Sequence, residues 1–400
     1  MRRTVLIFTF VLTVTALALG VSADLSEESR QAIFDKMVSV MKKTAYLPDV
    51  TSERLDAMVE EKRASILSAE SDVEFQRRVD AWFRTMGFSH LDLLAPAEAK
   101  RRTQGSMVGL GVELRFDKGE PEVVHVFPGS GADKIGLQPG DVILEIDGEK
   151  YDRQKGASGP VGTTFSLKYR TADGTVHQRR VVRQEFKTDK PLVVQKLDGN
   201  IGYLRVWSFM RYSSKEVAAA LETLKDTDGL ILDLRLNGGG SVMWMSDLLS
   251  RFLPERTRVG AFLSKGEGKD ELIERPVVVG RSEKNRYKGK MVVLIDEGSA
   301  SASEISAAAL RETGRATLMG RKTAGAVLSS TYIPVGEGYV LQVPLQDYKT
   351  KDGVRLEGNG VKPDIELSRE VVRPTPGQPD EAIEAARLTL LGKPVTAGTK

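Results

Sequence analysis

The sequence predicts a multi-domain α/β protein, and three observations lead to this fold class. The chain has 400 residues, which is enough for two or three domains with substantial cores. From about residue 188 onward, apolar strand-like runs alternate with amphipathic helical runs, as in an α/β domain. Ahead of that domain lie a helical region at 24–102 and a module of short strands with turn signals at 103–187.

Composition excludes several kinds of function. The 58 basic and 55 acidic residues nearly balance, so the net charge of +3 gives no support for nucleic-acid binding. The chain has no cysteine, which excludes disulfides, thiolate metal sites and a cysteine nucleophile. A histidine-dependent mechanism must choose among His90, His125 and His177. The last two fall on predicted strands of the 103–187 module, where we expect structural roles.

The first 23 residues have the organisation of a secretory signal peptide. Arg2 and Arg3 precede an apolar run that extends to about Gly20, and residues 21–23 form a small-x-small cleavage site. An uncleaved N-terminal anchor is the alternative, because the apolar run is just long enough to enter a membrane. In both cases, we expect the remainder to work outside the cytoplasm, as a periplasmic or secreted protein.

The module at 103–187 carries one specific motif. The stretch from 129 to 148 contains Gly-Leu-Gln-Pro-Gly-Asp followed by a short apolar strand, and it resembles a PDZ domain. The resemblance implies that a peptide C-terminus binds as an added strand at Gly109, Leu110, Gly111 and Val112, with its carboxylate on backbone N–H groups. A PDZ fold with a blocked groove, which acts only as a spacer, is the alternative.

The stretch from Gly298 to Ile305 is predicted to form a tight turn followed by a helix. An apolar run at 291–295 leads into it as a strand, and another strand at 315–319 completes a βαβ unit. Small residues at such a turn let a hydroxyl stand clear of the backbone, and the free N–H groups of the helix start can bind a developing negative charge. The pattern is typical of a nucleophilic serine; a serine-rich helix N-cap is the alternative.

A second candidate segment follows the predicted buried strand at 229–235. This strand runs into Gly238-Gly239-Gly240, and consecutive glycines allow close backbone approach to a ligand. A plain flexible turn is the alternative. A phosphate loop is not expected, because no Lys-Ser/Thr pair follows the glycines.

Five segments occur in a fixed order behind the PDZ-like module. They are 201–206, 233–240, 298–305, 320–325 and 360–365. In this order they resemble the C-terminal processing peptidases, also called tail-specific proteases. The resemblance implies a crotonase-like α/β serine protease core at 188–372 with an inserted PDZ domain and an N-terminal helical region. A linker and a C-terminal helix occupy 373–400. It also implies that Ser301 is the nucleophile and that no metal or cofactor takes part.

One departure from the family pattern concerns the general base. In the bacterial branch a lysine follows the Thr-x-Gly motif, but here Ala326 stands in that position and cannot accept a proton. Lys322 is close in sequence but lies on the other side of the motif, so it is only a secondary candidate base. Proteins similar to the tricorn protease use a histidine from a Ser-His pair far upstream instead. This chain has Ser89-His90 at the end of the helical region.

The tricorn-like resemblance implies a Ser/His active site in place of the Ser/Lys dyad. His90 would take the proton from Ser301, and Ser89, oriented by Glu357, would position the histidine. The oxyanion would be bound by the backbone N–H of Gly239 or Gly240 together with that of Ala302.

The predicted protein is therefore a secreted or periplasmic serine endopeptidase. It would act on proteins or peptides with free C-termini, which it would recognise through the PDZ domain. The N-terminal and C-terminal helical segments are also compatible with a homo-oligomer. Two alternatives stay open: a catalytically inactive PDZ-bearing scaffold, and an active hydrolase whose PDZ domain is regulatory.

Overall fold

The structure is a computed structural model, and it describes a defined part of the chain. The described residues are 24–48, 50–104, 106–116, 120–151, 157, 159, 161–188, 192–210, 212–266, 272–280, 286–372 and 379–395. The predicted signal peptide at 1–23 and nearly all of the proline-rich linker lie outside them. No helix in the described ranges combines the length and the apolar character needed to cross a membrane.

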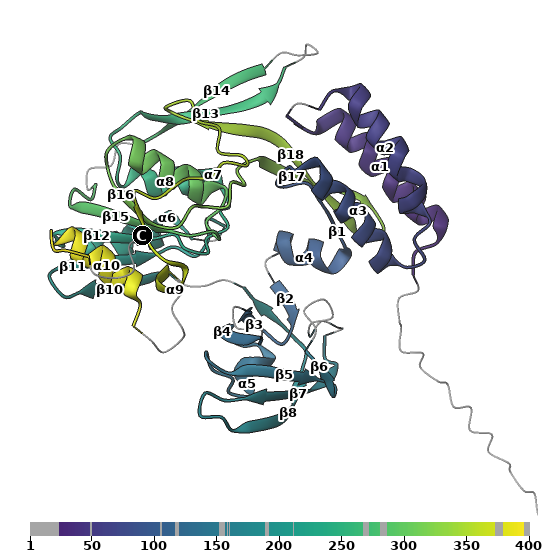
Figure 1. Ribbon diagram of the computed structural model, residues 1–400, viewed down its shortest axis with the longest axis horizontal. Helices are drawn as coiled ribbons and strands as arrows, with labels where there is room; N and C mark the ends of the chain where they lie inside the picture. Colours follow the sequence, from purple (N-terminus) through teal and green to yellow (C-terminus); the bar gives the residue numbers. More distant parts are fainter. Residues whose placement is uncertain are drawn as a thin grey trace, which may run out of the picture.

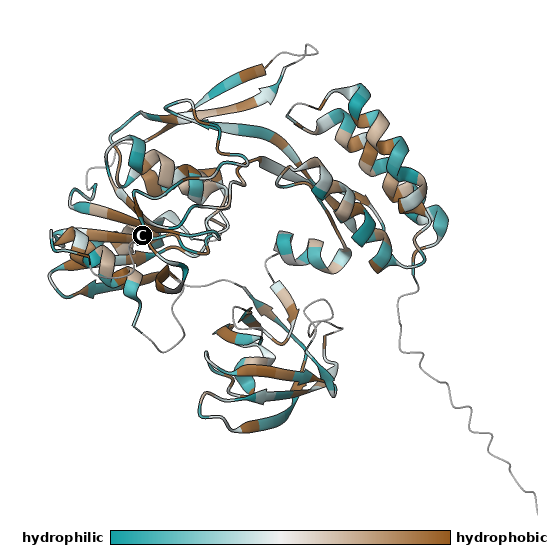
Figure 2. Ribbon diagram, in the orientation of Figure 1, coloured by the Kyte–Doolittle hydropathy of each residue, from teal (hydrophilic) through white to brown (hydrophobic). Residues whose placement is uncertain are grey.

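A six-stranded, mostly parallel sheet forms the centre of the larger lobe (Figure 1). Its order is β10 (Val193–Leu197), β11 (Ile201–Arg205), β12 (Gly229–Asp233), β15 (Lys290–Ile295), β16 (Thr317–Gly320) and β19 (Ile365–Glu366). Only β10 pairs antiparallel with its neighbour. The central strands are almost wholly buried and apolar, as expected for a parallel sheet covered on both faces (Figure 2).

Helices cover both faces of this sheet. Side chains alternate along each strand, so Leu230 and Leu232 pack on one face and Ile231 on the other. The first face is covered by α6 (Ser214–Leu224), α7 (Val242–Ser250) and α8 (Ala302–Glu312). The second face is covered by α9 (Arg369–Val372) and α10 (Glu381–Leu390). The β15–α8–β16 segment forms the expected βαβ unit.

A second, antiparallel sheet joins the larger lobe to the N-terminal helices. It contains β1 (Asp92–Leu94), β13 (Thr257–Lys265), β14 (Leu272–Val279), β17 (Ser329–Gly336) and β18 (Tyr339–Thr350). The helices α1 (Glu27–Thr44), α2 (Ser52–Leu67) and α3 (Asp72–Met86) share one core with β17 and β18. The expectation that region 24–102 is helical is therefore wrong for β1, which pairs with β18 about 250 residues later in the chain.

The β-rich module has its own core. Its strands are β2 (Ser106–Gly109), β3 (Val112–Arg115), β4 (Glu122–Val126), β5 (Val142–Ile146), β6 (Glu149–Lys150), β7 (Thr164–Arg170), β8 (Val176–Val182) and β9 (Gln184–Lys187). A short helix, α5 (Gly131–Lys134), packs with them around Phe165 and Leu167. The helix α4 (Pro96–Gln104) leads from β1 into the module and crosses the expected boundary at residue 102.

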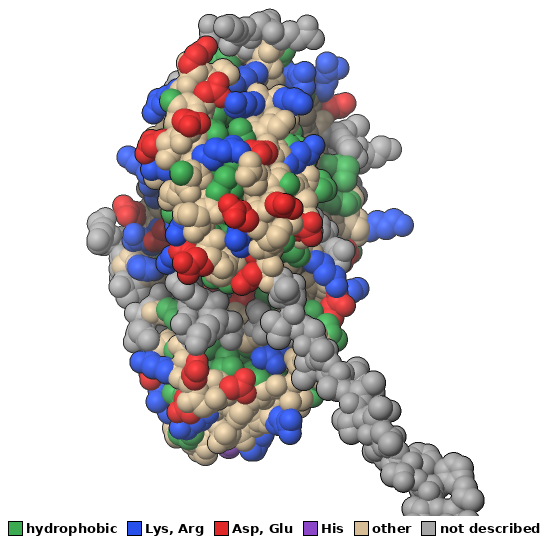
Figure 3. Space-filling model, turned by 90° about the vertical axis from the view of Figure 1, so that its right-hand side faces the viewer, with side chains coloured by type: hydrophobic (Ala, Val, Ile, Leu, Met, Phe, Trp, Pro, Cys, Tyr) green, Lys and Arg blue, Asp and Glu red, His purple; other side chains and the backbone are tan. Residues whose placement is uncertain are grey.

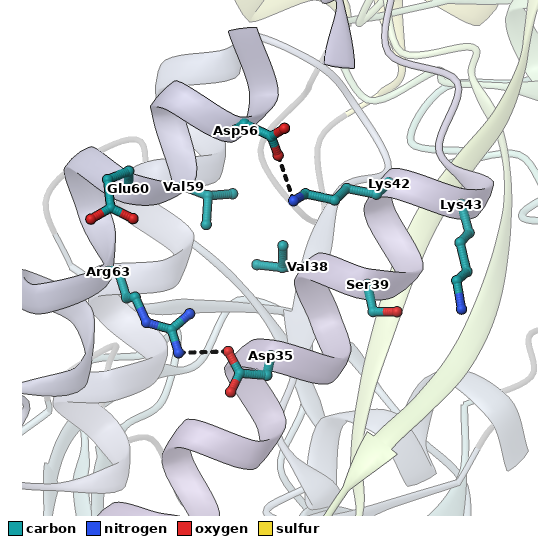
Figure 4. A pocket seen from close by; sticks show the side chains of 9 residues that line it. All are labelled: Asp35, Val38, Ser39, Lys42, Lys43, Asp56, Val59, Glu60 and Arg63. Carbon is teal, nitrogen blue, oxygen red and sulfur yellow. Dashed lines mark ion pairs between the residues drawn. The ribbon is translucent and has the colours of Figure 1, made fainter. Parts of the chain in front are cut away.

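The outer face of α1 and α2 carries acidic and basic side chains in a mixed arrangement (Figure 3). A pocket lies between these two helices, over the side chains of Val38 and Val59. Two ion pairs border it, Lys42 with Asp56 and Arg63 with Asp35 (Figure 4). The pocket contains none of the candidate catalytic residues, and partly exposed ion pairs contribute at most about 1 kcal/mol each.

Candidate functional site

Ser301 lies at the turn between β15 and α8, at the carboxyl end of the parallel sheet. Its backbone has φ 55° and ψ −120°, and a positive φ is uncommon for a residue other than glycine. Its N–H donates to the carbonyl oxygen of Ala326 at 2.8 Å. Strained conformations of this kind persist only where the surrounding contacts hold them, and they cluster at functional sites. Ser301 is also the N-cap residue of α8. The two interpretations of this stretch, helix N-cap and nucleophile turn, therefore apply to the same residue and do not exclude each other.

The glycine loop after β12 contacts this turn directly. A Cβ added to Gly239 would lie 2.7 Å from the Cβ of Ser301 and 2.9 Å from the nitrogen of Ala302. Gly239 also has φ 92°, so only glycine fits there without strain. The close backbone approach expected of this loop is thus an approach to the serine turn itself.

The backbone N–H groups near Ser301 distinguish the two glycines that were expected as alternative oxyanion donors. The N–H of Gly239 donates to Oδ1 of Asn237 at 2.9 Å and is therefore occupied in this conformation. The N–H groups of Gly240 and Ala302 have no acceptor among the described residues. These two remain the candidate oxyanion donors.

Ser89 and His90 follow α3 in a short turn, where His90 has φ 58°. The Oγ of Ser89 lies 2.8 Å from Nδ1 of His90 and donates to Oε2 of Glu357 at 3.0 Å. The backbone N–H of Ser89 also donates to Oε1 of Glu357 at 2.8 Å. Because the hydroxyl gives its one proton to the carboxylate, the ring must donate from Nδ1. That tautomer leaves Nε2 with a free lone pair.

Burial decides the charge state of His90. Desolvation lowers the pKa of its imidazole below the ordinary value, and this effect exceeds the opposing pull of the carboxylates of Glu357 and Asp92. The nearby guanidinium of Arg102 adds to the lowering. His90 is therefore neutral at neutral pH, the form that can accept a proton.

One backbone segment joins the histidine network to the serine turn. Glu357 accepts at Oε2 from the N–H of Val327 at 2.8 Å. The preceding residue, Ala326, accepts from the N–H of Ser301. No hydrogen bond joins the side chains of Ser301 and His90 within the described ranges, and such contacts often tighten only when substrate binds.

Glu304 is a further residue of this site that sequence reasoning did not find. Its carboxylate is fully buried and accepts four hydrogen bonds. Oε1 accepts from Oγ1 of Thr323 at 2.5 Å and from the N–H of Gly325 at 2.8 Å, and Oε2 accepts from the N–H of Ala326 at 2.9 Å and of Ser301 at 3.1 Å. Burial raises the pKa of Glu304, against the lowering effect of these donors. In the sequence, the signal for Glu304 was its position three residues after the N-cap serine, where a glutamate commonly bonds back to the N-cap backbone.

The second candidate base is not brought into this network. Lys322 has an exposed side chain, whereas its neighbour Thr323 turns inward to Glu304. Among the described residues, no three histidine, aspartate or glutamate side chains form a group that could hold a metal ion.

Residues 200–367 match Peptidase family S41. The chain belongs to peptidase family S41. The matched S41 segment contains Ser301, Glu304 and Glu357, whereas Ser89 and His90 lie outside it.

Two curated relatives carry names that fit this family. A carboxyl-terminal-processing protease of Synechocystis sp. is 33% identical over 284 residues, which are 68% of this chain and 65% of that protein. A carboxy-terminal-processing protease of Bartonella bacilliformis is 31% identical over 315 residues, which are 69% of this chain and 65% of that protein. The chain thus spans about two thirds of the length of the curated relatives it matches.

A solved structure supports the fold. The photosystem II D1 C-terminal processing protease is 22% identical, with a TM-score of 0.53, and the match covers 87% of this chain and 94% of that chain. The predicted multi-domain α/β fold of an S41 protein is confirmed.

The predicted peptide-binding residues lie in the β-rich module, apart from the Ser301 network. Gly109, Leu110 and Gly111 lead into Val112, the first residue of the edge strand β3. Gly111 has φ 85°, and a Cβ there would overlap Ser130. The loop therefore requires glycine, as expected where a backbone turns tightly.

Proposed function

We propose that the chain is a serine endopeptidase in which Ser301 is the nucleophile and His90 the general base. The observation that carries the proposal is the hydrogen-bonded set Ser89–His90–Glu357, which is tied through Val327 to the segment that binds Ser301. It supplies a neutral imidazole whose hydrogen-bond network shares one backbone segment with the strained serine, although Ala326 replaces the lysine of related enzymes.

In the proposed mechanism, Nε2 of His90 takes the hydroxyl proton of Ser301 as the oxygen attacks the peptide carbonyl. The imidazolium that forms is stabilised through Ser89 by the carboxylate of Glu357. The N–H groups of Gly240 and Ala302 bind the oxyanion, and one such donor contributes about 3 kcal/mol. The imidazolium then protonates the leaving amine, and water hydrolyses the acyl-enzyme.

The module at 103–187 is proposed to be a PDZ domain that binds the C-terminus of the substrate. Among the described residues β3 is an end strand of its sheet, and this position and the glycine loop before it support the role, because a peptide can be added as a strand at such an edge. A substrate peptide ending in a carboxamide tests it. We expect the carboxamide to raise KM about tenfold or more over the free acid; equal KM values contradict the PDZ assignment.

The signal-like first 23 residues support a location outside the cytoplasm. N-terminal sequencing of the mature protein tests this proposal. A mature chain that begins near residue 24 supports secretion, and retention of the unprocessed chain in the cytoplasm contradicts it.

The principal test of the activity compares Ser301→Ala with the native protein on an unfolded protein substrate. We expect cleavage by the native protein and none by the variant. The alternative function, a PDZ-bearing scaffold without activity, predicts no cleavage by either protein. That alternative is not favoured, because a scaffold has no need of the partly buried hydrogen bonds that hold Ser89, His90 and Glu357 together.

A further inference from the structure

Two exposed methionines lie beside the glycine loop that approaches Ser301. The side chain of Met210 is 51% exposed and that of Met243 is 56% exposed. The other methionines of the described ranges are buried or half-buried, and Met245, which follows Met243 in α7, is fully buried. The accessible thioether groups in the described part of the chain are therefore concentrated at one place, next to the proposed active site.

Both methionines lie close to Gly240, whose N–H is a candidate oxyanion donor. Phe209 forms a bridge with Gly240, and its N–H donates to the carbonyl oxygen of Gly239 at 2.8 Å. A Cβ added to Gly240 would lie 2.9 Å from the backbone nitrogen of Met210. Met243 follows Gly240 in the chain and belongs to the first turn of α7. A chemical change in either side chain therefore occurs beside the backbone that would bind the oxyanion.

Methionine is the sulfur-containing residue of this chain that peroxides can oxidise, because the chain contains no cysteine. With hydrogen peroxide, the O–O bond breaks and one oxygen atom forms an S–O bond with the thioether. The sulfur loses an electron pair, and the second oxygen atom leaves as water. The product, methionine sulfoxide, is polar, whereas the thioether is apolar and only a weak hydrogen-bond acceptor. Sulfoxide reductases reverse the reaction.

We propose that Met210 and Met243 form an oxidation site through which peroxides lower the activity of the Ser301 centre. The proposal rests on the proposed peptidase activity, which provides its readout. Oxidation introduces polar S=O groups beside Gly240, where they compete for its N–H or displace the glycine loop. Removal of a whole oxyanion donor lowers kcat about 100-fold or more, so we expect a partial loss of this donor to lower kcat about tenfold.

Peroxide treatment of the native protein tests the site and its effect together. Samples are taken over time, the sulfoxide at each methionine is measured by mass spectrometry of a digest, and kcat is measured on the same samples. We expect Met210 and Met243 to be oxidised well before Met245, which is the internal control because it lies in the same helix but is buried. We expect kcat to fall as they are oxidised. Equal oxidation of Met245, or full oxidation of the exposed pair with kcat within about twofold of the untreated value, overturns the proposal.

Leucine variants assign the loss of activity to these two residues. Leucine has nearly the volume of methionine but no sulfur, so it cannot be oxidised in this way. In the double variant Met210→Leu with Met243→Leu, we expect peroxide to change kcat less than about twofold relative to the same variant untreated. The matched control is Met107→Leu, which replaces a half-buried methionine of β2 and should lose activity as the native protein does. A double variant that peroxide inactivates as fast as the native protein overturns the proposal.

Enzymatic repair provides a test that needs no variant. Oxidised native protein is treated with the two types of methionine sulfoxide reductase, one for each sulfoxide epimer, and a thiol reductant. The reductant has no disulfide of this chain to act on, because the chain has no cysteine. We expect kcat to return to within about twofold of its untreated value. Activity that stays lost after both sulfoxides are reduced overturns the proposal. Failure of the proposed function gives a different result, because the untreated native protein then cleaves no peptide.

Discussion

Replacing Glu304 by glutamine is the most direct test of how the site is held together. The carboxylate accepts hydrogen bonds from the serine turn, through the N–H of Ser301, and from the neighbouring segment, through Thr323, Gly325 and Ala326. It therefore holds the turn and that segment together. Glutamine has nearly the same shape but offers one acceptor oxygen and one NH₂ donor. Whichever way the amide turns, its NH₂ faces at least one backbone N–H that has lost its acceptor.

The magnitude follows from counting these donors. If the amide oxygen replaces Oε1, the N–H groups of Ala326 and Ser301 face a donor, but Ser301 still has the carbonyl of Ala326 at 2.8 Å. One buried N–H is then unsatisfied, which costs about 1–3 kcal/mol. Removal of a buried charge offsets part of this cost, since burial already raises the pKa of Glu304. We expect a net loss of about 1–2 kcal/mol, or a Tm lower by about 2–8 °C.

The effect on activity is expected to be larger than the effect on stability. A displaced Ala326 also moves Val327, which anchors Glu357 and through it the histidine. Misplacement of catalytic groups by about 1 Å costs about 100-fold in rate. We therefore expect kcat to fall about 100-fold in Glu304→Gln, with KM changed less than threefold because the substrate surfaces stay in place.

Steady-state kinetics on one peptide and thermal unfolding provide the assay. The matched control is Glu297→Gln, whose carboxylate forms a partly exposed ion pair with Arg321. Partly exposed pairs contribute little, so the control should keep its Tm within about 2 °C and its kcat within twofold. A Glu304→Gln protein with native kcat would show that the segment after Thr323 does not position the catalytic groups, and the reasoning would fail.

Three further predictions concern the base and the glycine loop. Burial lowers the pKa of His90, so its neutral form persists below pH 6.5. The acidic limb of the pH profile of kcat/KM should therefore have an apparent pKa below 6.5. An acidic limb near or above about pH 7 contradicts His90 as the base. His90→Ala should reduce kcat as severely as Ser301→Ala, whereas Lys322→Ala should stay within twofold of native; the reverse order in the same kinetic assay contradicts the Ser–His assignment. Gly239→Ala should lower kcat about 100-fold because its Cβ would meet Ser301 at 2.7 Å, whereas Gly238→Ala, with nothing within 4 Å, should stay near native; equal rates for the two variants refute the packing argument.

The parts of the fold that depend on local sequence could be predicted. The strand–turn–helix around Ser301 is encoded by an apolar run, small residues and a helical run that are neighbours in the chain, and the structure has β15, the turn and α8 there. The second sheet could not be predicted in the same way. β1 has three residues, and its pairing with β18 depends on contacts between segments about 250 residues apart.

The same distinction holds within the site. The residue types of Ser89, His90 and Glu357 suggested a catalytic set through a family resemblance, and the structure brings these three together across 268 residues. Their catalytic roles stay predictions. The occupied N–H of Gly239 was not predictable, because it depends on the rotamer of the Asn237 side chain rather than on the spacing of residues.

The structure also explains why Ala326 is compatible with an organised site. In this chain residue 326 acts through its backbone, since its N–H binds Glu304 and its carbonyl binds Ser301. Neither contact depends on the side chain, so a lysine can be lost there without releasing the segment. The next residue, Val327, holds Glu357 and hence the Ser89–His90 pair. Two carboxylates, those of Glu304 and Glu357, thus hold one short backbone segment, and we propose that this segment aligns His90 with Ser301.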